Sequence, residues 1–504
     1  MKLNHIYKSI ACGVLLAMTA TSCDLDYNPV DTYSDVTEGV NKTDEKPIFN
    51  SVQDVETSMV TLHKKFRDQQ EHWYVDKLLI GDAHSDNAYA GTTGAEVVPY
   101  ETNSIEGSNS VLKRDWDRFL GDIAVANRII VGCDQLKALS ESERGKYQSQ
   151  AKIFRAMVMF DMVRLWGNFP VITTVGGDIT EDNVEEMYPT YFPPQNTAEE
   201  AYAQIEKDLT EAVENPNTPT NDTSDKSILT KSVARAMLAK VYAEKPLRDY
   251  AKVIKYADEL AADGFDLVED FSDLWAYDTE KKDCRVRNAK EAILEAHFPP
   301  GSGNWCTWMF GRNLSNWDES FTWAKWITPS RDLIRLYEEQ GDTKRYNESV
   351  VWYDCGWSNY YPADHYKCRS AFNSIIYLRY ADILLLKAEA KIMGETPDLN
   401  GAADIIDRIR NRAGLGKLPQ STRSSKEALL QAYMDERRME LAFEGQRWYD
   451  LCRLNKVEEV MNAVYAKDSG RHAQENLFNE NSYLLAIPQG AIDQNENLIQ
   501  NPGY

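Results

Sequence analysis

This 504-residue chain has little basic charge for its size. It carries 56 Lys and Arg against 79 Asp and Glu, which gives a formal net charge of −23 at pH 7. Nonspecific nucleic-acid binding requires a basic surface, so the charge argues against that class of function. An acidic surface keeps a protein soluble, but it does not identify a ligand.

Cysteines are few and scattered. The eight cysteines form no CxxC or Cys/His metal-binding spacing, which argues against a disulfide framework and against a zinc site. Four of them lie in one region of the chain, so a bridge among these four is an open alternative in an oxidising compartment: Cys284, Cys306, Cys355 and Cys368.

Motifs for catalysis are also missing. The sequence contains no Walker loop, no HExxH and no GxSxG, and His84 and His365 are isolated histidines in expected loops. We therefore expect a protein that is not an enzyme and uses no cofactor. A calcium site built from side chains near Asp82 or Asp86 is an alternative, although the EF-hand pattern is absent.

The N-terminus carries an apolar run, ACGVLLAMTA, that is too short to span a bilayer as a helix. Lys2 and Lys8 precede or flank it and small residues follow, which predicts a signal peptide over residues 1–22. The small residues before Cys23 resemble a bacterial lipobox, although Ala20 stands where Leu is more frequent. Acylation of Cys23 would supply the membrane anchor, with residues 23–48 as a flexible tether. Plain secretion is the alternative.

Apolar residues at helical spacing predict a series of helices, at about 52–67, 112–136, 151–166, 198–214, 230–243 and 249–262. Pairs of short helices rich in Ala and Tyr are typical of tetratricopeptide-like units. We therefore predict a mainly α fold, a tetratricopeptide-like helical-pair scaffold with a large loop-rich insertion and few short strands. Residues 81–109 are expected to form a loop.

Three further helices are predicted between Tyr377 and Asn455. Gly394 and Gly414 end the first two, and Ser424 or Ser425 caps the third. Gly445 precedes Trp448 in the third helix and would let another backbone come close. This stretch is expected to be a packing scaffold, with a ligand surface as the alternative.

Residues 296–374 differ in amino-acid composition from the predicted helices, and we name them the insert. They are rich in Gly, Asn and Pro and contain seven of the twelve tryptophans. Loops on a rigid support are where binding usually occurs. The insert separates an N-terminal helical part (49–295) from a C-terminal helical core (375–455), and a docked tail with a short buried strand at SYLLAIP follows (456–504).

Several motifs in order resemble the SusD/RagB family. They are RYADILLLKAEA, RIRNRAGL, ERRMELAFEGQRWYDLCR and the terminal YLLAIP and NPGY, with AKIFRAMVMFDMVRLWGNFPVIT and LTKSVARAMLAKVYAE upstream. That family consists of outer-membrane lipoproteins that bind nutrients and work with a SusC-like TonB-dependent transporter. The resemblance implies one SusD-like helical domain over residues 49–504. It also implies a lipid-anchored outer-membrane protein, with Asp24 and Asp26 after Cys23 favouring the cell exterior.

A sugar ring binds where an aromatic plane contacts its C–H face and polar groups meet its hydroxyls. Two regions offer such groups, and from them we predict ligand contact by Trp73, Asp86, Asn87 and Tyr89, and by Trp305, Trp308, Arg312, Asn313 and Trp317. For any single Trp, packing is the alternative reading. Trp116, Trp166 and Trp448 lie on apolar helix faces and are assigned to the core.

We therefore expect a surface lipoprotein that captures an oligosaccharide and delivers it to a partner transporter. The membrane would be contacted through the lipid anchor, and nucleic acid is not an expected partner. Two alternatives stay open at this stage. One is peptide capture by a lipoprotein of the same uptake type, and the other is a surface-anchored glycoside hydrolase.

Overall fold

The computed structural model describes residues 47–504, apart from 92–93, 178, 180–182, 279, 282, 299–302, 307–325, 353–362, 369 and 371–372. Residues 47–175 and 192–504 form one compact unit. Residues 176–191 are grouped with the N-terminal residues in a second unit, where helix α7 (Val184–Met187) leads into the 3-10 turn η4 (Tyr188–Tyr191). Cys23 and the predicted signal peptide and tether up to residue 46 lie outside the described residues.

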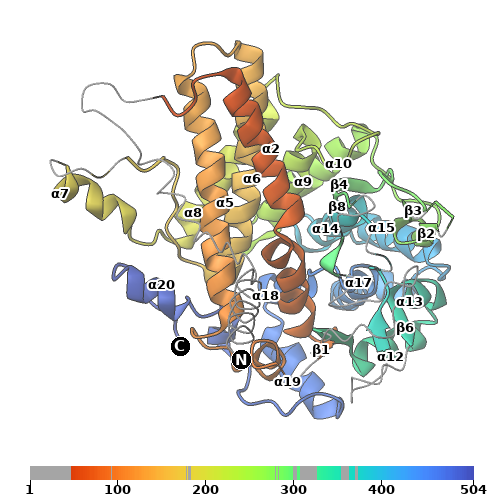
Figure 1. The fold of residues 1–504 in the computed structure, drawn as a ribbon. Coiled ribbons are helices and arrows are strands. Elements are labelled where there is room, and N and C mark those ends of the chain that lie inside the picture. The colour runs from red at the N-terminus through yellow and green to blue at the C-terminus, as the bar shows by residue number, and fades with distance from the viewer. Residues whose placement is uncertain are drawn as a thin grey trace, which may run out of the picture. The chain divides into compact units, whose positions relative to one another are not determined.

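Three long helices lie side by side in the first part of the large unit: α2 (Val52–Asp68), α5 (Ser110–Gln135) and α6 (Glu141–Trp166) (Figure 1). Ser51 and Ser140 each begin a helix with a capping box, in which the serine side chain accepts a hydrogen bond from the third helical N–H group. The three predicted helices are confirmed, and α6 extends ten residues further toward the N-terminus than the apolar stripe indicated.

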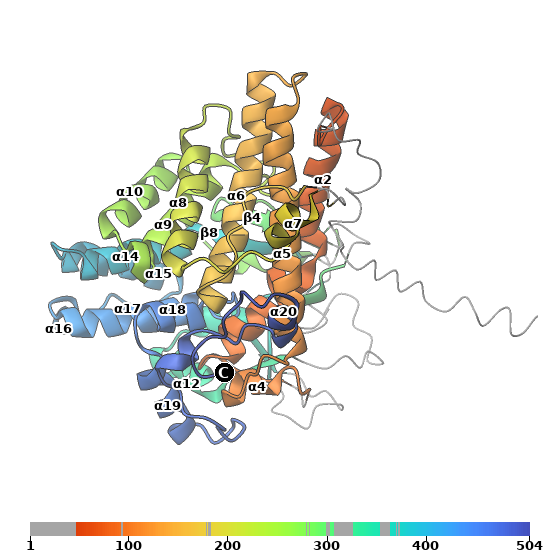
Figure 2. The same ribbon diagram turned by 90° about the vertical axis from the view of Figure 1, so that its left-hand side faces the viewer.

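Helix pairs continue through the chain, as predicted. The next helices are α8 (Ala198–Glu214), α9 (Lys231–Ala243) and α10 (Tyr250–Ala262), followed after the insert by α14 (Tyr380–Met393), α15 (Leu399–Arg412) and α17 (Lys426–Glu440). Each of these helices packs on its neighbour in this series. Helix α10 contacts α14, although the insert separates the two in sequence (Figure 2). The large unit is therefore a tetratricopeptide-like helical scaffold, and the predicted fold class is confirmed.

The C-terminal helices differ from the prediction at two points. Tyr377 belongs to strand β8 (Ile375–Arg379), so the first helix begins three residues later than expected. The predicted third helix is broken in two, because Phe443 and Gly445 have φ angles of 60° and 69° and a short helix, α18 (Arg447–Arg453), follows. Asp82 stabilises the break by accepting hydrogen bonds from the N–H groups of Phe443 (3.1 Å) and Gly445 (2.9 Å).

Glycines allow the close backbone approach predicted at Gly445. A Cβ atom at Gly445 would lie 2.9 Å from the carbonyl oxygen of Lys77, and one at Gly81 would overlap the backbone of Gly445. The facing segment is helical, whereas a loop was expected from residue 81. It consists of two π-helical turns, η2 (Glu71–Val75) and η3 (Leu79–Ala83), around α3 (Asp76–Leu78). Such turns place additional side chains on one face of a helix.

Within the described residues, all sheets have two strands. Strand β4 (Ala292–Ala296) pairs with β8, and β1 (Ala88–Ala90) pairs with β5 (Ile327–Pro329), both antiparallel. The remaining pairs are β2 (Tyr277–Asp278) with β3 (Asp283–Cys284), and β6 (Val350–Trp352) with β7 (Ala363–His365). Because β4 ends where the insert begins and β8 begins where it ends, this ladder brings the two ends of the insert together.

Short helices complete the large unit. They are α4 (Val98–Thr102), α12 (Arg331–Gln340), α13 (Thr343–Ser349), α16 (Gln420–Arg423), α19 (Val457–Lys467) and α20 (Gln489–Gln494), with 3-10 turns η5 (Lys245–Leu247), η6 (Phe271–Leu274) and η7 (Glu480–Tyr483). The strand predicted at SYLLAIP is wrong, because Leu485 and Ala486 pair singly with the end of α6 and with the Trp166 indole. No described helix has the length and apolar character needed to cross a bilayer.

A cluster of buried charges joins α13, β8, α15 and α17, and the ERRMEL motif supplies part of it. Glu440 accepts hydrogen bonds from Arg379 (2.6 Å), Arg345 (3.0 Å) and Arg412. Burial opposes ionisation of Glu440, but Arg412, Arg379 and Arg345 outweigh it and hold its pKa well below the ordinary value. The motif is therefore a scaffold element, as expected from the sequence.

Candidate functional site

The structure places Trp73 in the core. Its side chain is 0% exposed, and its indole N–H donates to Asp122 at 3.0 Å. Phe66 and Phe119 contact the ring edge to face, at centroid distances of 5.2 and 6.4 Å. A buried indole whose donor is satisfied offers no plane to a sugar, so the prediction of ligand contact at Trp73 is corrected.

Asp86 and Asn87 are also buried, in contacts that join the residues before β1 to α17 and α18. The carboxylate of Asp86 accepts two hydrogen bonds from Arg447, at 2.8 and 3.0 Å, and Asn87 accepts one from Arg438 at 3.0 Å. Burial would raise the pKa of Asp86, yet Arg438 and Arg447 hold it below the ordinary value. Both residues act within the fold, and the prediction that they contact a ligand is corrected.

The same contacts bear on the alternative of a calcium site near Asp82 or Asp86. The two carboxylate oxygens of Asp82 accept hydrogen bonds from the Asn87 side chain and from two backbone N–H groups, and Asp86 is paired with arginines. Within the described residues, no group of three or more His, Cys, Asp or Glu side chains has an arrangement that could hold a metal ion.

Tyr89 is buried as well, and its hydroxyl connects two segments. It donates to Asp468 at 2.7 Å and accepts a hydrogen bond from the backbone N–H of Arg331 at 2.8 Å. The ring of Tyr89 therefore does not form the exposed surface that was expected. It lies directly behind the cavity described below.

The second predicted group lies mostly outside the described residues. Trp308, Arg312, Asn313 and Trp317 are among the insert residues that the structure does not describe. Trp305 is half-buried against the core, and its backbone N–H donates to the Gln70 side chain at 2.7 Å. In the rest of the insert, the Trp352 side chain is 48% exposed, with its indole N–H donating to Tyr346 at 2.5 Å.

The tryptophans assigned to the core are confirmed there, since Trp116, Trp166 and Trp448 are 3%, 0% and 1% exposed. Polar contacts hold the base of the insert, which we define as the described residues at its two ends. Gln70 of the scaffold donates to the carbonyl of Gly303 at 3.0 Å, and the Asn304 side chain donates to the carbonyl of Asn373 at 3.1 Å. The first contact joins the insert to the scaffold, and the second joins its two ends to each other.

Cysteines at this base are thiols in the structure. Cys284, Cys306 and Cys368 are free, and Cys355 lies outside the described residues. Burial, together with a hydrogen bond to Cys368, raises the pKa of the Cys306 thiol well above its ordinary value. This thiol is therefore not a reactive nucleophile at neutral pH.

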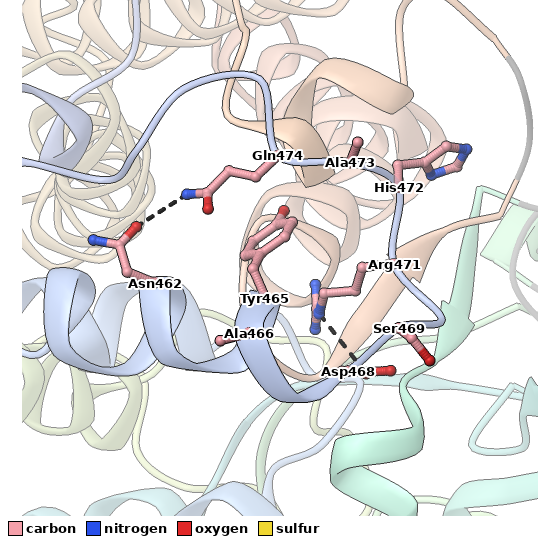
Figure 3. A pocket seen from close by; sticks show the side chains of 9 residues that line it. All are labelled: Asn462, Tyr465, Ala466, Asp468, Ser469, Arg471, His472, Ala473 and Gln474. Atoms are coloured by element: carbon pink, nitrogen blue, oxygen red, sulfur yellow. Dashed lines mark hydrogen bonds and ion pairs between the residues drawn. The ribbon is translucent and has the colours of Figure 1, made fainter.

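A cavity of about 410 Å³ lies between the end of α19 and the loop that follows it (Figure 3). We name it the Arg471 pocket, and the residues that line it are Asn462, Tyr465, Ala466, Asp468, Ser469, Arg471, His472, Ala473 and Gln474. This pocket was not predicted, because residues 456–504 were expected only as a docked tail. The combination of Tyr, Asp, Arg and His within eight residues was the available signal.

Arg471 is the most unusual member of this pocket. Its side chain is 1% exposed, and its guanidinium lies 5.3 Å from the centre of the Tyr89 ring and 5.5 Å from that of Tyr465. Beside it, His472 forms a 2.8 Å hydrogen bond with the carboxylate of Glu101, which raises the pKa of the imidazole. The pocket therefore combines aromatic faces with positive charge.

The position of the pocket connects it to the insert. Tyr89 lies in β1, whose partner β5 belongs to the insert, and the Arg331 side chain, also from the insert, packs against Gly470 in the pocket loop. A Cβ atom at position 470 would overlap that guanidinium. Glycine is therefore required for Arg331 to pack there, and the base of the insert and the pocket belong to one contiguous region.

Comparison with known proteins agrees with this architecture. The SusD family model matches residues 302–504, and a second model, described as starch-binding associating with outer membrane, matches residues 32–243. SusD-like protein P2 of Formosa agariphila is 25% identical over 470 residues, 85% of this chain and 87% of the relative. A SusD-like protein of Bacteroides ovatus is 25% identical over 488 residues, covering 88% and 81% of the two chains.

Solved structures with the same fold include two surface glycan-binding proteins A. The protein from Bacteroides fluxus has a TM-score of 0.71 at 21% identity, over 90% of this chain and 100% of that one. The protein from Bacteroides thetaiotaomicron, solved in complex with laminarihexaose, has a TM-score of 0.70 at 17% identity, over 89% and 99%. From the two matching family models, the curated relatives and the shared helical fold, this chain belongs to the SusD/RagB family.

Proposed function

We propose that this protein is a surface-exposed lipoprotein that binds a glycan without chemical turnover and passes it to a TonB-dependent transporter in the same outer membrane. The observation that carries the proposal is the likeness of nearly the whole chain to surface glycan-binding proteins, one of them solved in complex with laminarihexaose. The lipobox-like sequence before Cys23 and the family model described as associating with the outer membrane support its location.

The arrangement of the large unit is suited to capture. The helical scaffold holds the base of the insert through β4–β8 and β1–β5, so the aromatic-rich sequence of the insert is joined to a support that is already ordered. An ordered support lowers the entropy that binding must offset. The Trp-rich residues of the insert supply stacking planes, and the Arg471 pocket at its base supplies polar contacts.

Glycan binding is tested by screening the purified protein against an array of plant, algal and bacterial oligosaccharides. We expect saturable binding to one structural class, and a parallel incubation should return each glycan unshortened. Binding to peptides in place of glycans would favour the peptide-uptake alternative. Shortened products would support a glycoside hydrolase.

Delivery is tested by isolating the full-length lipoprotein from outer membranes under mild detergent. We expect a TonB-dependent transporter to copurify at a fixed ratio and glycan uptake to stop when Cys23 is replaced by Ala. A lipoprotein that is recovered without any transporter, with normal uptake in its absence, would contradict the delivery step.

A further inference from the structure

The guanidinium of Arg471 is buried without a hydrogen-bond acceptor. All three of its nitrogen atoms, Nε, Nη1 and Nη2, are shielded from solvent and have no hydrogen-bond partner. A guanidinium carries five N–H donors, and leaving buried donors of a charged group unsatisfied is costly. Such a group gains strongly from any ligand that supplies an acceptor.

The neighbouring groups satisfy Arg471 only in part. Asp468 forms an ion pair with it at 3.9 Å, which is longer than a hydrogen bond. The carboxylate oxygens of Asp468 already accept hydrogen bonds, one from the Tyr89 hydroxyl at 2.7 Å and one from the N–H of Gly470 at 3.0 Å. Tyr89 and Tyr465 contribute ring faces, which stabilise a cation but accept no N–H hydrogen bond in the plane of the guanidinium.

Other groups at the pocket also favour the binding of a hydrogen-bond acceptor that carries negative charge. The hydroxyl of Tyr465 is also shielded from solvent; it faces the Arg471 guanidinium and donates no hydrogen bond. His472 is paired with Glu101, and Lys467 is paired with Asp332 at 2.7 Å, so the acidic side chains nearest the pocket are already engaged by protein cations. The side chain of Arg331 brings a second guanidinium against Gly470.

We infer that the Arg471 pocket binds the acidic group, carboxylate or sulfate, of a negatively charged oligosaccharide. This inference rests on the proposed function and specifies its substrate class. A planar guanidinium binds either group through two parallel hydrogen bonds, and the Tyr465 hydroxyl is placed to donate a third. The flanking rings of Tyr89 and Tyr465 exclude water around the charge.

Binding requires a local movement. The nitrogens of Arg471 are shielded from solvent, whereas Ser469 and Ala473, which also line the pocket, are exposed. Rotation of the Arg471 side chain toward the exposed part of the pocket brings its guanidinium to the acidic group while α19 stays in place. The cost of that movement is offset by the hydrogen bonds that the acidic group then makes.

The test compares matched glycans by calorimetry on the purified protein: oligogalacturonate with its methyl ester, and sulfated carrageenan oligosaccharides with their desulfated form. We expect the charged member of one pair to bind tenfold to a hundredfold more tightly, since hydrogen bonds to charged groups contribute about 1.5–3 kcal/mol. The pair that shows the difference identifies the group as carboxylate or sulfate. The Arg471→Gln variant should lose the preference, whereas Arg335→Gln, which removes an exposed arginine from α12, should keep it.

The outcomes separate this inference from the proposed function. Equal affinity for charged and neutral members, or an Arg471→Gln variant that keeps the preference, would overturn the inference and leave glycan capture standing. Protein that binds no glycan of any kind would overturn both. Should Arg471→Gln fail to fold, Tyr465→Phe keeps the ring and removes only the hydroxyl, and it should weaken binding of the charged member severalfold without lowering the Tm.

Discussion

Arg379 shows how this fold holds charge in its interior. Its side chain is 1% exposed and donates to Glu291 at 2.8 Å, to Glu440 at 2.6 Å and to both oxygens of Glu444, at 2.7 and 2.8 Å. Removing water from so many charges is expensive, and only complete pairing offsets that cost. Each member of the cluster therefore depends on all the others.

Replacing Arg379 with Met should destabilise the protein strongly. The substitution leaves Glu291, Glu440 and Glu444 without one of their cations, and breaking a buried pair in this way costs about 3–5 kcal/mol. The free energy of unfolding, measured in denaturant, checks this. Lys387→Met is the control, because its partner Asp258 is mostly exposed, and it should cost below about 1 kcal/mol. Similar losses for both variants would contradict the account.

His84 should make the protein less stable in mild acid. Its ring is buried against Trp448, at a centroid distance of 3.9 Å, and donates to the carbonyl of Tyr100 at 2.5 Å. Burial lowers its pKa to about 4, so the unfolded chain binds a proton near pH 6.5 that the folded protein does not. Stability should therefore fall as pH drops from about 6.5 to 4, by about 3 kcal/mol in total.

The His84→Gln variant isolates this effect. It should show a shallower loss of stability over the same pH range, although its stability at pH 7 is lower because the ring contact is lost. His472→Gln serves as the control. The pKa of His472 is raised by Glu101, so its protonation stabilises the fold fully below about pH 6.5 and this contribution is lost at higher pH; its removal should lower stability without changing the slope between pH 6.5 and 4. Parallel pH profiles for wild type and His84→Gln would refute this role of His84.

Single residues were the least predictable part of the sequence. Asp86 and Tyr89 were expected on a loop because Gly, Asn and Asp are frequent around them, and Trp73 was expected to contact a ligand with them. In the structure two π-helical turns and the short strand β1 carry this segment into the core, where Asp122, Arg447 and Asp468 satisfy its polar atoms. Those partners lie 49 to 379 residues away, so no local pattern indicated the burial.

At the scale of elements, helices were predictable where caps and apolar stripes coincide. Residues 198–214 match α8 at both ends because Thr197 caps a stripe formed by Ala201, Ile205, Leu209 and Ala212. The break between α17 and α18 was not predictable. The local sequence AFEGQR continues the helical pattern, and the bonds from Asp82 that stabilise the turn come from a distant segment.

The close approach at this break predicts that Gly445→Ala destabilises the protein. Gly445 has a φ of 69°, and a Cβ atom there would lie 2.9 Å from the Lys77 carbonyl oxygen. Backbone strain and steric overlap together should cost about 1–3 kcal/mol in thermal or denaturant unfolding. Gly416→Ala is the matched control, since its Cβ would meet nothing within 4 Å, and its effect should be small. Equal effects would show that α17 and α18 can separate from α3.

At the scale of the whole molecule, the family resemblance and the recurring pairs of predicted short helices predicted the fold class correctly, because both extend over most of the chain. Ligand specificity was harder to predict from the sequence. Under the proposed function it depends on the insert and on a pocket in the C-terminal tail, where Arg471 is flanked by Tyr89 and Tyr465 from segments almost 400 residues apart. Only the folded chain brings such residues together.

The measurement that tests the account most directly is calorimetric titration of the purified protein with the oligosaccharide class selected on the array, followed by analysis of the recovered glycan. The account predicts saturable binding at one site, with a glycan recovered at its original length. No heat of binding for any glycan, or recovery of shortened chains, would contradict the central claim that this protein captures a glycan without turnover.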